Sequence, residues 1–307
     1  TRFCLMNSDG AGVDHSSLML DENASIADKW VVSRLNRTAK EVNAALDKYF
    51  FHEAVSLLYH FFWDDFCDWY IELVKDEIGD ASNVGARTRI LTILEIALRM
   101  LHPFMPYLTE ELWHKLPGTS NALHHTAYSA AESTIMLTSF PPGDARAIDE
   151  RAESEMQSVI DVISKVRNIR AEMQIKPSDR VDVHVAANVD AQKVFAENEA
   201  QILKLARADK LVLGEKFDVP KASAKAVTTV AEIAVPLEGL IDFEKEIARL
   251  ENALTKLEAE NARLVGQLSN ANFVERAPAE KVREIRDRVA EIDTQVAALR
   301  QNLEALK

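Results

Sequence analysis

Two ladders of apolar residues near the end of the chain constrain its fold most strongly. Between residues 243 and 268, and again between 282 and 306, apolar residues recur at alternating three- and four-residue steps. This spacing is the seam of a coiled coil. When the two segments are laid antiparallel, apolar positions face each other throughout, as in Leu264 with Ile285 and Leu257 with Ile292. We therefore predict a helical hairpin that turns near residue 275.

The tip of this hairpin is predicted at about residues 269–279. Pro278 fits the start of the return helix, because its missing N–H costs nothing in the first turn. Asn261, opposite Val289, is the one polar break in the seam and is expected to set the register. Phe273 either caps the end of the seam, which we favour, or contacts a partner.

Basic side chains concentrate near the predicted tip. Arg263 and Arg288 should stand at the same height, with Arg276 and Lys281 close by. A solvated coiled-coil face of mixed charge would explain these residues equally well. The position of the arginines alone therefore leaves both readings open.

Residues 1–142 are dominated by helical periodicity. An amphipathic helix is predicted from Asp28 to Tyr49, with Val31, Leu35, Val42, Leu46 and Tyr49 on its apolar face. Arg34, Arg37 and Lys40 form a basic stripe on another face, which is either a solvated surface or a contact with RNA phosphates.

Two further helices complete this first region. Residues 52–75, apolar nearly all round, predict a central helix packed on several sides, and Pro103 and Pro106 should end or bend the helix over 87–116. We therefore predict a helix bundle over residues 1–142.

Residues 143–237 change character. A helix is expected from about 144 to 173, followed by a strand at "RVDVHVA", a helix opened by Asp190 as N-cap, and strands at "KLVLG" and "VTTVAEIAVP". The fold class is therefore mainly α, with a bundle over 1–142, a small α+β linking domain over 143–237 and a coiled-coil hairpin over 238–307.

Composition excludes several classes of function. The formal net charge of -13 argues against bulk binding of nucleic acid, DNA included, because phosphates repel an acidic surface. Any RNA contact must come from local basic stripes. Cys4 and Cys67 form no CxxC pair, and no run of eighteen apolar residues occurs. We expect a cytoplasmic protein that does not enter the membrane. Because Thr1 is not a start methionine, we also expect a fragment of a longer chain.

Candidates for catalysis are weak. Asp64, Asp65 and Asp68 could bind a metal or act as acids and bases, but acids at the solvent edge of a helix, or paired with arginines, explain them better. The adjacent imidazoles of His124 and His125 are not spaced as ligands on one face. The chain has no phosphate-binding loop and no GxSxG or HExxH motif. No catalytic or metal-binding residue is predicted.

Several stretches together resemble one family. "TRFCLMN", "DKWVVSRLNR", "FFWDDFCDWYIELVK" and "LHPFMPYLTEELW" resemble the anticodon-binding domain of class I aminoacyl-tRNA synthetases for aliphatic amino acids. "VRNIRAEMQIKPSD", "VPLEGLIDFEKEIARLENAL" and "LSNANFVERAPAEKVREIRDR" are similar to the bacterial-type valyl-tRNA synthetase family in particular. The resemblance covers essentially the whole chain.

The resemblance implies specific roles. Phe3, beside Arg2, would stack on an anticodon base, with Arg34, Arg37 and Lys40 near the anticodon, and Arg263, Arg288, Arg276 and Lys281 would contact the outer corner of a valine tRNA. A core aromatic is the competing reading of Phe3. The HIGH- and KMSKS-type signatures and the editing domain are missing, so this chain alone should not activate valine. ATP and Mg would serve the full-length enzyme.

Two other classes of function stay open at this point. A protein-interaction module would use Phe273 and Val274 at the hairpin tip, and a metal hydrolase would use the three aspartates. We expect the protein to be a monomer.

Overall fold

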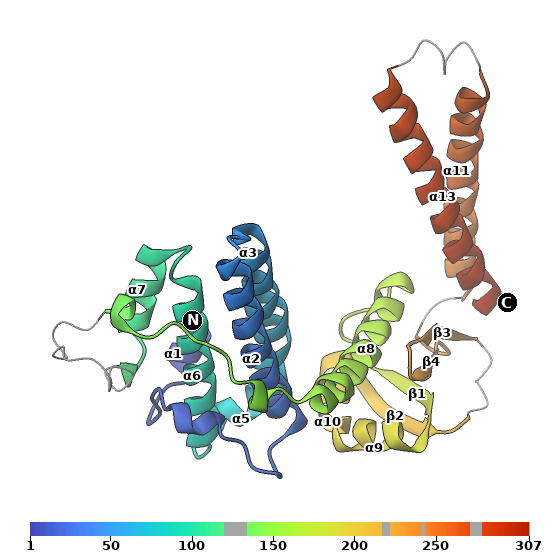
Figure 1. Cartoon of the computed structure of the whole chain (residues 1–307). Coiled ribbons are helices and arrows are strands. Elements are labelled where there is room, and N and C mark those ends of the chain that lie inside the picture. The colour runs from blue at the N-terminus through green and yellow to red at the C-terminus, as the bar shows by residue number, and fades with distance from the viewer. Residues whose placement is uncertain (120–133, 217–221, 241–242, 271–277, 307) are drawn as a thin grey trace. The chain divides into compact units, whose positions relative to one another are not determined.

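The computed structural model describes residues 1–119, 134–216, 222–240, 243–270 and 278–306. It is mainly helical with one small sheet, as predicted (Figure 1). The chain divides into two compact units, Thr1–Gln157 and Ser158–Lys307. The boundaries predicted near residues 142 and 237 stay predictions, and each unit is described by itself below.

The first unit is built from helices alone within its described residues. The α-helices are α1 (Arg2–Met6), α2 (Ile26–Asp47), α3 (Phe51–Tyr59), α4 (Ile71–Leu73), α5 (Lys75–Gly79), α6 (Val84–Leu101) and α7 (Pro106–His114). The short 3₁₀ helices η1 (His15–Leu18), η5 (Ile135–Leu137) and η6 (Ala145–Ala147) lie in connections, and η2 (His60–Tyr70) is a π-helix.

Helix α2 confirms the amphipathic helix predicted for this region. Its N-cap is Ser25, whose hydroxyl accepts a hydrogen bond from the amide of Asp28 at 3.1 Å. Val31, Leu35 and Val42 are buried along one face. Tyr49 was wrongly assigned to that face: α2 ends before it, the residue has a positive φ of 59°, and its side chain is exposed.

The central helix of the bundle is α6, not the helix predicted over 52–75. All eight residues from 91 to 98 are buried. By contrast, α3 and η2 bury one face only, through residues such as Ala54, Leu58 and Phe61, and leave Tyr59 and Trp63 exposed. The prediction failed because apolar residues all round a helix do not require that every face has a protein neighbour. As predicted, the proline pair separates two helices, since α6 ends at Leu101 and Pro106 opens α7.

A buried carboxylate links three segments of the bundle. Asp28 of α2 is 4% exposed. It accepts a hydrogen bond from the hydroxyl of Tyr70 at 2.8 Å. It also forms an ion pair with Nη1 of Arg89 on α6 at 2.7 Å. A buried charge is tolerated when it is paired and hydrogen-bonded, so this triad positions α2, η2 and α6 together.

The second unit combines helices with a four-stranded sheet. Helix α8 (Glu150–Glu172) leads into it and is followed by β1 (Val181–Ala187), α9 (Val189–Glu197), α10 (Glu199–Ala206), β2 (Ala208–Gly214), β3 (Ser223–Val227) and β4 (Ala231–Pro236). The strand order is β2-β1-β4-β3, with β1 parallel to β2 and the other two pairings antiparallel. The strands predicted at "RVDVHVA" and "KLVLG" are confirmed as β1 and β2. The single strand predicted at "VTTVAEIAVP" is wrong in its extent, because a turn after Val227 separates the end of β3 from β4, and most of β3 was not predicted.

Helix boundaries in this unit differ from the prediction in two places. Asn188, not Asp190, is the N-cap of α9, and its side chain accepts from the amide of Ala191 at 2.9 Å. The single helix predicted here is two, because the chain breaks at Asn198 between α9 and α10. Helix α8 begins at Glu150, later than expected, after the 3₁₀ turn of η6.

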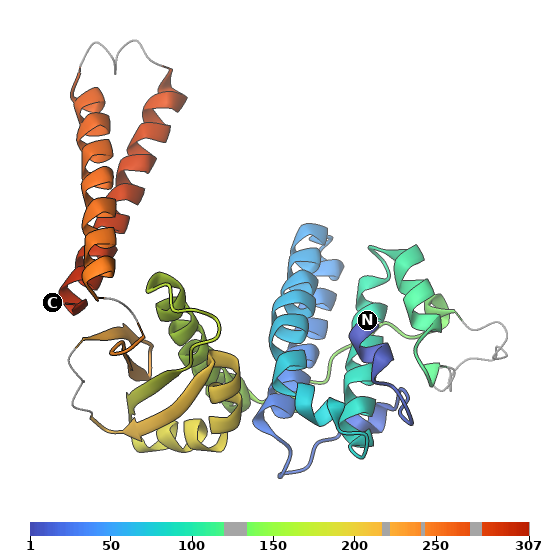
Figure 2. The same cartoon turned by 180° about the vertical axis from the view of Figure 1, so that it is seen from behind.

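The hairpin is formed by α11 (Phe243–Ser269) and α13 (Ala279–Leu306), which lie side by side in both views (Figures 1 and 2). Leu264, Ile285 and Ile292 form its buried core, with Leu257, Leu268, Val289 and Val296 packed against them. The seam residues predicted to pack together therefore share one core between the two helices, and their exact register stays a prediction. Pro278 directly precedes α13, and its carbonyl accepts from the amide of Val282 at 3.2 Å.

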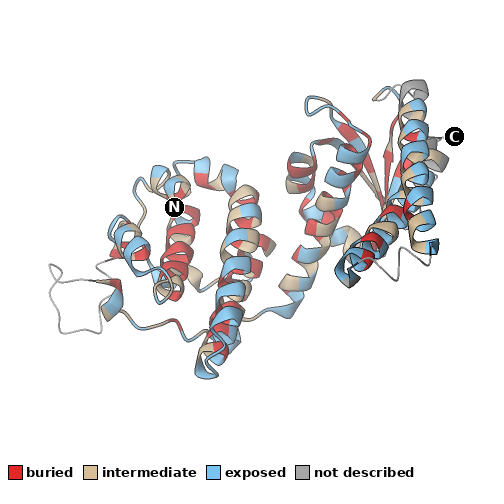
Figure 3. Cartoon of the chain, turned by 90° about the horizontal axis from the view of Figure 1, so that it is seen from above, coloured by how far each residue is buried: buried red, intermediate tan, exposed pale blue. Residues whose placement is uncertain are grey.

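Most described residues of the hairpin are exposed or partly exposed, and its buried residues lie in the seam (Figure 3). None of the helices among the described residues combines the length and hydropathy needed to span a bilayer.

Candidate nucleic-acid interface

Arg2 and Phe3 lie on α1 at the edge of the bundle. Arg2 is exposed, Phe3 is half-buried, and the next residue, Cys4, is 1% exposed and belongs to the core. The partial exposure of Phe3 leaves part of its ring accessible to a planar partner, whereas a core aromatic would be enclosed. Its stacking on an anticodon base stays a prediction.

The basic stripe on α2 is not the solvated face that one reading proposed. Nε of Arg34 lies 2.8 Å from Oδ2 of Asp65, and Nε of Arg37 lies 3.0 Å from both carboxylate oxygens of Glu153. Both arginines therefore carry a carboxylate partner inside the bundle. Lys40 is exposed. Contacts of these three residues with RNA stay a prediction.

Residues 141–149, which we call the strap, run along α2 beside this stripe. Side chains of α2 hold the strap by hydrogen bonds: Asn43 Nδ2 donates to the carbonyl of Pro141 at 2.8 Å, and Asn36 Oδ1 accepts from the amide of Asp144 at 2.8 Å. The hydroxyl of Ser33 accepts from the amide of Asp149 at 2.8 Å. The strap is thus fixed along nearly three turns of the helix, from Ser33 to Asn43.

The three aspartates of η2 do not form a metal site. Burial raises the pKa of Asp65 above its usual value, although the Arg34 guanidinium opposes the shift. Asp64 Oδ2 lies 2.7 Å from Nδ1 of His60. No group of three potential metal ligands occurs among the described residues. Pairing with an arginine, one of the alternatives considered for these acids, is confirmed for Asp65, while His124 and His125 lie outside the described residues.

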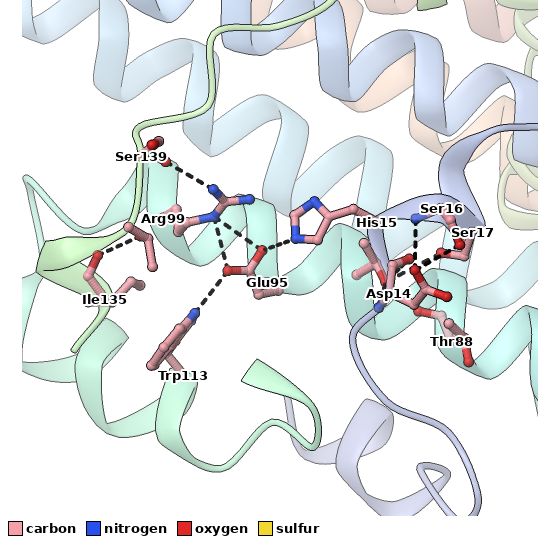
Figure 4. Close-up of polar contacts among 12 residues, drawn as sticks. Asp14, His15, Ser16, Ser17, Thr88, Glu95, Arg99, Trp113, Ile135 and Ser139 are labelled. Atoms are coloured by element: carbon pink, nitrogen blue, oxygen red, sulfur yellow. Dashed lines mark hydrogen bonds and ion pairs between the residues drawn. The ribbon is translucent and has the colours of Figure 1, made fainter. Parts of the chain in front are cut away.

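A second buried carboxylate was missed by sequence reasoning. Glu95 of α6 is fully buried and is the meeting point of three donors (Figure 4). Trp113 Nε1 donates to it at 2.9 Å, Nε of Arg99 lies 3.0 Å away, and Nε2 of His15 lies 3.4 Å away. A lone acid in an apolar helical run, four residues before an arginine, was the signal available in the sequence.

The environment of Glu95 decides its charge. Burial alone would raise its pKa, but the hydrogen bonds from His15 and Trp113 and the charge of Arg99 outweigh burial and hold the pKa below its usual value. Nη1 of Arg99 also donates to the carbonyl of Ser139 at 2.9 Å. The carboxylate therefore connects η1, α6 and α7, and Arg99 extends the network to the segment before the strap.

A groove of about 1050 Å³ runs beside this network within the first unit. Its walls come from η1, α2, α6 and the strap, and they include apolar side chains such as Val32, Leu35 and Ile96. Its charged lining is balanced, with Lys29, Arg99 and Arg146 against Asp21, Asp144 and Asp149. The groove therefore does not favour an anion over a cation.

In the arm, by which we mean α11 and α13, Arg288 reaches from α13 to a side chain of α11. Nε of Arg288 lies 3.1 Å from Oε1 of Glu260, which is one helical turn from Arg263. Arg263 is exposed, and no ion-pair partner for it occurs among the described residues. Lys281 pairs with Glu284 at 2.7 Å.

The remaining tip residues cannot be placed in the same way. Arg276 lies outside the described residues, as do Phe273 and Val274, on which the interaction-module alternative rests. Asn261 sits in the seam as predicted, and its Nδ2 donates to Oδ1 of Asp293 at 2.6 Å. Its own Oδ1 is buried without a hydrogen-bond partner among the described residues.

Comparison with known proteins links the helical bundle and the arm to RNA-binding families. Residues 28–185 match the model of the anticodon-binding domain of tRNA ligase, and residues 242–307 match the model of the valyl-tRNA synthetase tRNA-binding arm. The chain is similar to the valine–tRNA ligases of Geobacter sulfurreducens (38% identity over all of this chain and 34% of that protein) and Thermotoga maritima (39%, over 94% and 31%). Bacillus subtilis valine–tRNA ligase is 34% identical over the whole chain and 34% of its own length. The chain thus spans about a third of the length of these curated relatives.

Proposed function

Because the chain belongs to the valyl-tRNA synthetase family, we propose that it is the tRNA-binding part of a valine–tRNA ligase. The bundle reads the anticodon, and the arm holds the outer corner of the same tRNA. Two separated contacts on one rigid RNA would fix the position of its acceptor end for aminoacylation elsewhere in the ligase.

The observation that carries the proposal is the arm. Its two antiparallel helices are formed by the residues that match a tRNA-binding arm. Arg263 and Arg288 come from different helices, and Arg288 pairs with Glu260, three residues before Arg263. An exposed arginine is well suited to a phosphate, because its planar fork donates two parallel hydrogen bonds.

In the bundle, the proposal assigns direct contact to Phe3, Arg2 and Lys40. Phe3 would stack on an unpaired base, which typically contributes about 1–3 kcal/mol per base. Arg2 and Lys40 are exposed and would meet phosphates. Arg34 and Arg37 remain candidates, but their carboxylate partners mean that binding RNA would first require those ion pairs to be shared or exchanged.

We extend the proposal to the whole ligase as follows. Valine is activated by ATP with Mg²⁺ in a part of the enzyme that supplies the catalytic residues, and the amino acid is then transferred to valine tRNA. The protein acts as a monomer in the cytoplasm. A test is aminoacylation of valine tRNA by the complete enzyme, with and without an intact arm.

Binding by this chain can be tested with single substitutions on α11. Arg263→Gln removes the exposed arginine near the tip, and Lys256→Gln removes an exposed lysine one heptad earlier on the same face of the helix. We expect Arg263→Gln to weaken binding of whole valine tRNA about three- to tenfold and to lower the salt slope by about one unit. Lys256→Gln should keep the affinity and the salt slope of the parent chain.

The same variants should bind an isolated anticodon stem-loop as the parent chain does, because the stem-loop lacks the tRNA corner. Equal loss for Arg263→Gln and Lys256→Gln would show a diffuse charge effect and count against a defined arm contact. If the parent chain discriminates neither valine tRNA from other tRNAs nor tRNA from a stem-loop, the proposed function fails.

A further inference from the structure

A cluster of basic side chains lies at one end of the sheet in the second unit. The parallel strands β1 and β2 start at this end, where Val181 is aligned with Ala208. The turn before β1 and the junction between α10 and β2 therefore meet at the same edge. We call Arg170, Lys176, Arg180 and Arg207 the arginine edge.

Backbone carbonyls, rather than carboxylates, hold most of these guanidinium groups. Nη2 of Arg170 donates to the carbonyls of Lys176 at 3.1 Å and Asp179 at 2.8 Å, and its Nη1 donates to the carbonyl of Arg207 at 3.4 Å. Nη1 of Arg207 donates in turn to the carbonyl of Pro177 at 2.6 Å. A carbonyl orients an arginine without cancelling its charge.

Arg180 completes the edge. Its Nη1 donates to the carbonyl of Ala208 at 2.9 Å. Its carboxylate partner among the described residues, Asp209, is 3.7 Å from Nε, and both side chains are more than half exposed. A long ion pair in water contributes little and is easily exchanged. Arg180 and Arg207 are both exposed, as is Lys176, so a ligand in solution can reach them.

The charge of this edge opposes that of the whole chain. Residues 165–180 and 204–210 together carry eight basic and three acidic side chains, whereas the chain has a net charge of -13. The three acids are Glu172, Asp179 and Asp209. Burial, together with the neighbouring charge of Arg207, lowers the pKa of the Arg170 guanidinium below its usual value, which agrees with positive charge gathered in a small volume.

We propose that the arginine edge binds phosphate groups of the RNA backbone, as a contact on tRNA separate from the bundle and the arm. This inference rests on the proposed function, since tRNA is the RNA in question. Arginine forks held in place by carbonyls lose less conformational freedom on binding than free side chains do. The free N–H donors that each guanidinium retains match phosphate oxygens.

The test compares two double variants of the full chain. Lys176→Gln with Arg180→Gln removes two positive charges from the arginine edge. Lys193→Gln with Lys225→Gln removes two from exposed positions on α9 and β3 of the same unit. Affinity for labelled valine tRNA is measured by fluorescence anisotropy between about 50 and about 200 mM salt.

We expect the edge variant to bind about five- to twentyfold more weakly and its salt slope to fall by about one to two units, because up to two phosphate contacts are lost. The control variant should stay within about twofold of the parent. The Lys176 side chain is exposed and has no hydrogen bond or ion pair to any described residue. Lys176→Gln alone should therefore fold normally and give about half the change in salt slope. This single variant keeps the test valid if the double variant misfolds.

The outcomes separate this inference from the proposed function. If the parent chain binds tRNA with a salt-dependent affinity and both double variants behave like it, the arginine edge is not an RNA contact, while the proposed function stands. Equal weakening by both double variants also overturns the inference, because net charge would then explain it. If the parent chain does not bind tRNA at all, both proposals fall.

Discussion

At the scale of single residues, Gly143 is the position where the strap comes closest to α2. It has a positive φ of 74°, and a Cβ at this position would lie 2.6 Å from the carbonyl oxygen of Asn36 and 2.9 Å from the amide nitrogen of Lys40. Both are backbone atoms of a regular helix and cannot move aside cheaply. The backbone conformation and the close approach thus each require glycine here.

Gly143→Ala should therefore lower the free energy of unfolding of the first unit by about 3 kcal/mol, through left-handed strain plus overpacking. Gly10→Ala is the matched control, since Gly10 has nearly the same φ, 73°, but no atom within 4 Å of the added methyl group. It should cost about 1 kcal/mol. Urea unfolding measures both, and equal losses would show that the contact with α2 adds nothing.

Glu95 carries a buried charge that is paired within the bundle. Breaking a buried ion pair leaves an uncompensated charge, so Glu95→Gln should cost about 3 kcal/mol at about pH 7. Glu111→Gln is the control: it removes an ion pair of the same four-residue spacing, with Lys115 at 2.8 Å, at an exposed site. We expect no measurable change in unfolding there.

The pH dependence of this contribution has a defined sign. Because the folded pKa of Glu95 lies below its usual value, its stabilisation is complete above about pH 4.3 and is lost as the pH falls through the folded pKa. The difference in unfolding free energy between the parent chain and Glu95→Gln should thus shrink in acid. A difference that grows below about pH 4 would contradict this account.

At the scale of elements, the arm is the part that the sequence predicted best. Its register follows from local periodicity, because each apolar position repeats within seven residues and the two helices are neighbours along the chain. The one polar position, Asn261, combines a hydrogen bond to Asp293 with a buried carbonyl oxygen that has no partner among the described residues. The unpaired oxygen is the expected cost in stability, while the role of Asn261 in setting the register stays a prediction.

Asn261→Leu should stabilise the arm by about 1.4 kcal/mol, since it removes a buried unpaired oxygen and adds apolar contact with the seam. Amide hydrogen exchange in α11 and α13 would then slow about tenfold. Asn252→Leu on the exposed face of α11 should leave exchange unchanged. Faster exchange in Asn261→Leu would mean that the hydrogen bond to Asp293 outweighs the unpaired oxygen.

Other elements were less predictable because their partners are distant in sequence. Arg34 and Arg37 looked like a surface stripe, yet their carboxylates lie 31 and 116 residues away. The same reason hid the central role of α6, because composition does not say which apolar faces have neighbours. The stretch "VRNIRAEMQIKPSD" contains only Arg170 and Lys176 of the arginine edge, and Arg207 is brought to them by the pairing of β1 with β2.

At the scale of the whole molecule, the two compact units divide within α8, between Gln157 and Ser158. Each has its own buried core, represented by Leu94 in α6 and Ile233 in β4. A chain with separate cores is expected to unfold in separate steps rather than in one.

Calorimetry should therefore resolve two transitions. Leu94→Ala and Ile233→Ala each remove a side chain that is at most 1% exposed, at a cost of about 2–5 kcal/mol. Each variant should move one transition down by several degrees and leave the other in place. A common shift of both transitions by either variant would show that the chain unfolds as one cooperative body.

The polar contacts of α6 also determine how the bundle responds to changes in its core. Apolar burial is non-directional, so contacts like those of Leu94 alone would let a buried helix slide or rotate at little cost. On α6, Arg89 forms an ion pair with Asp28, and Glu95 accepts a hydrogen bond from Trp113. These two residues lie about 9 Å apart along the axis of α6. Two attachment points on a rigid rod remove both of these degrees of freedom. A smaller side chain in the core should therefore leave a cavity and lower stability while the helix keeps its axial position.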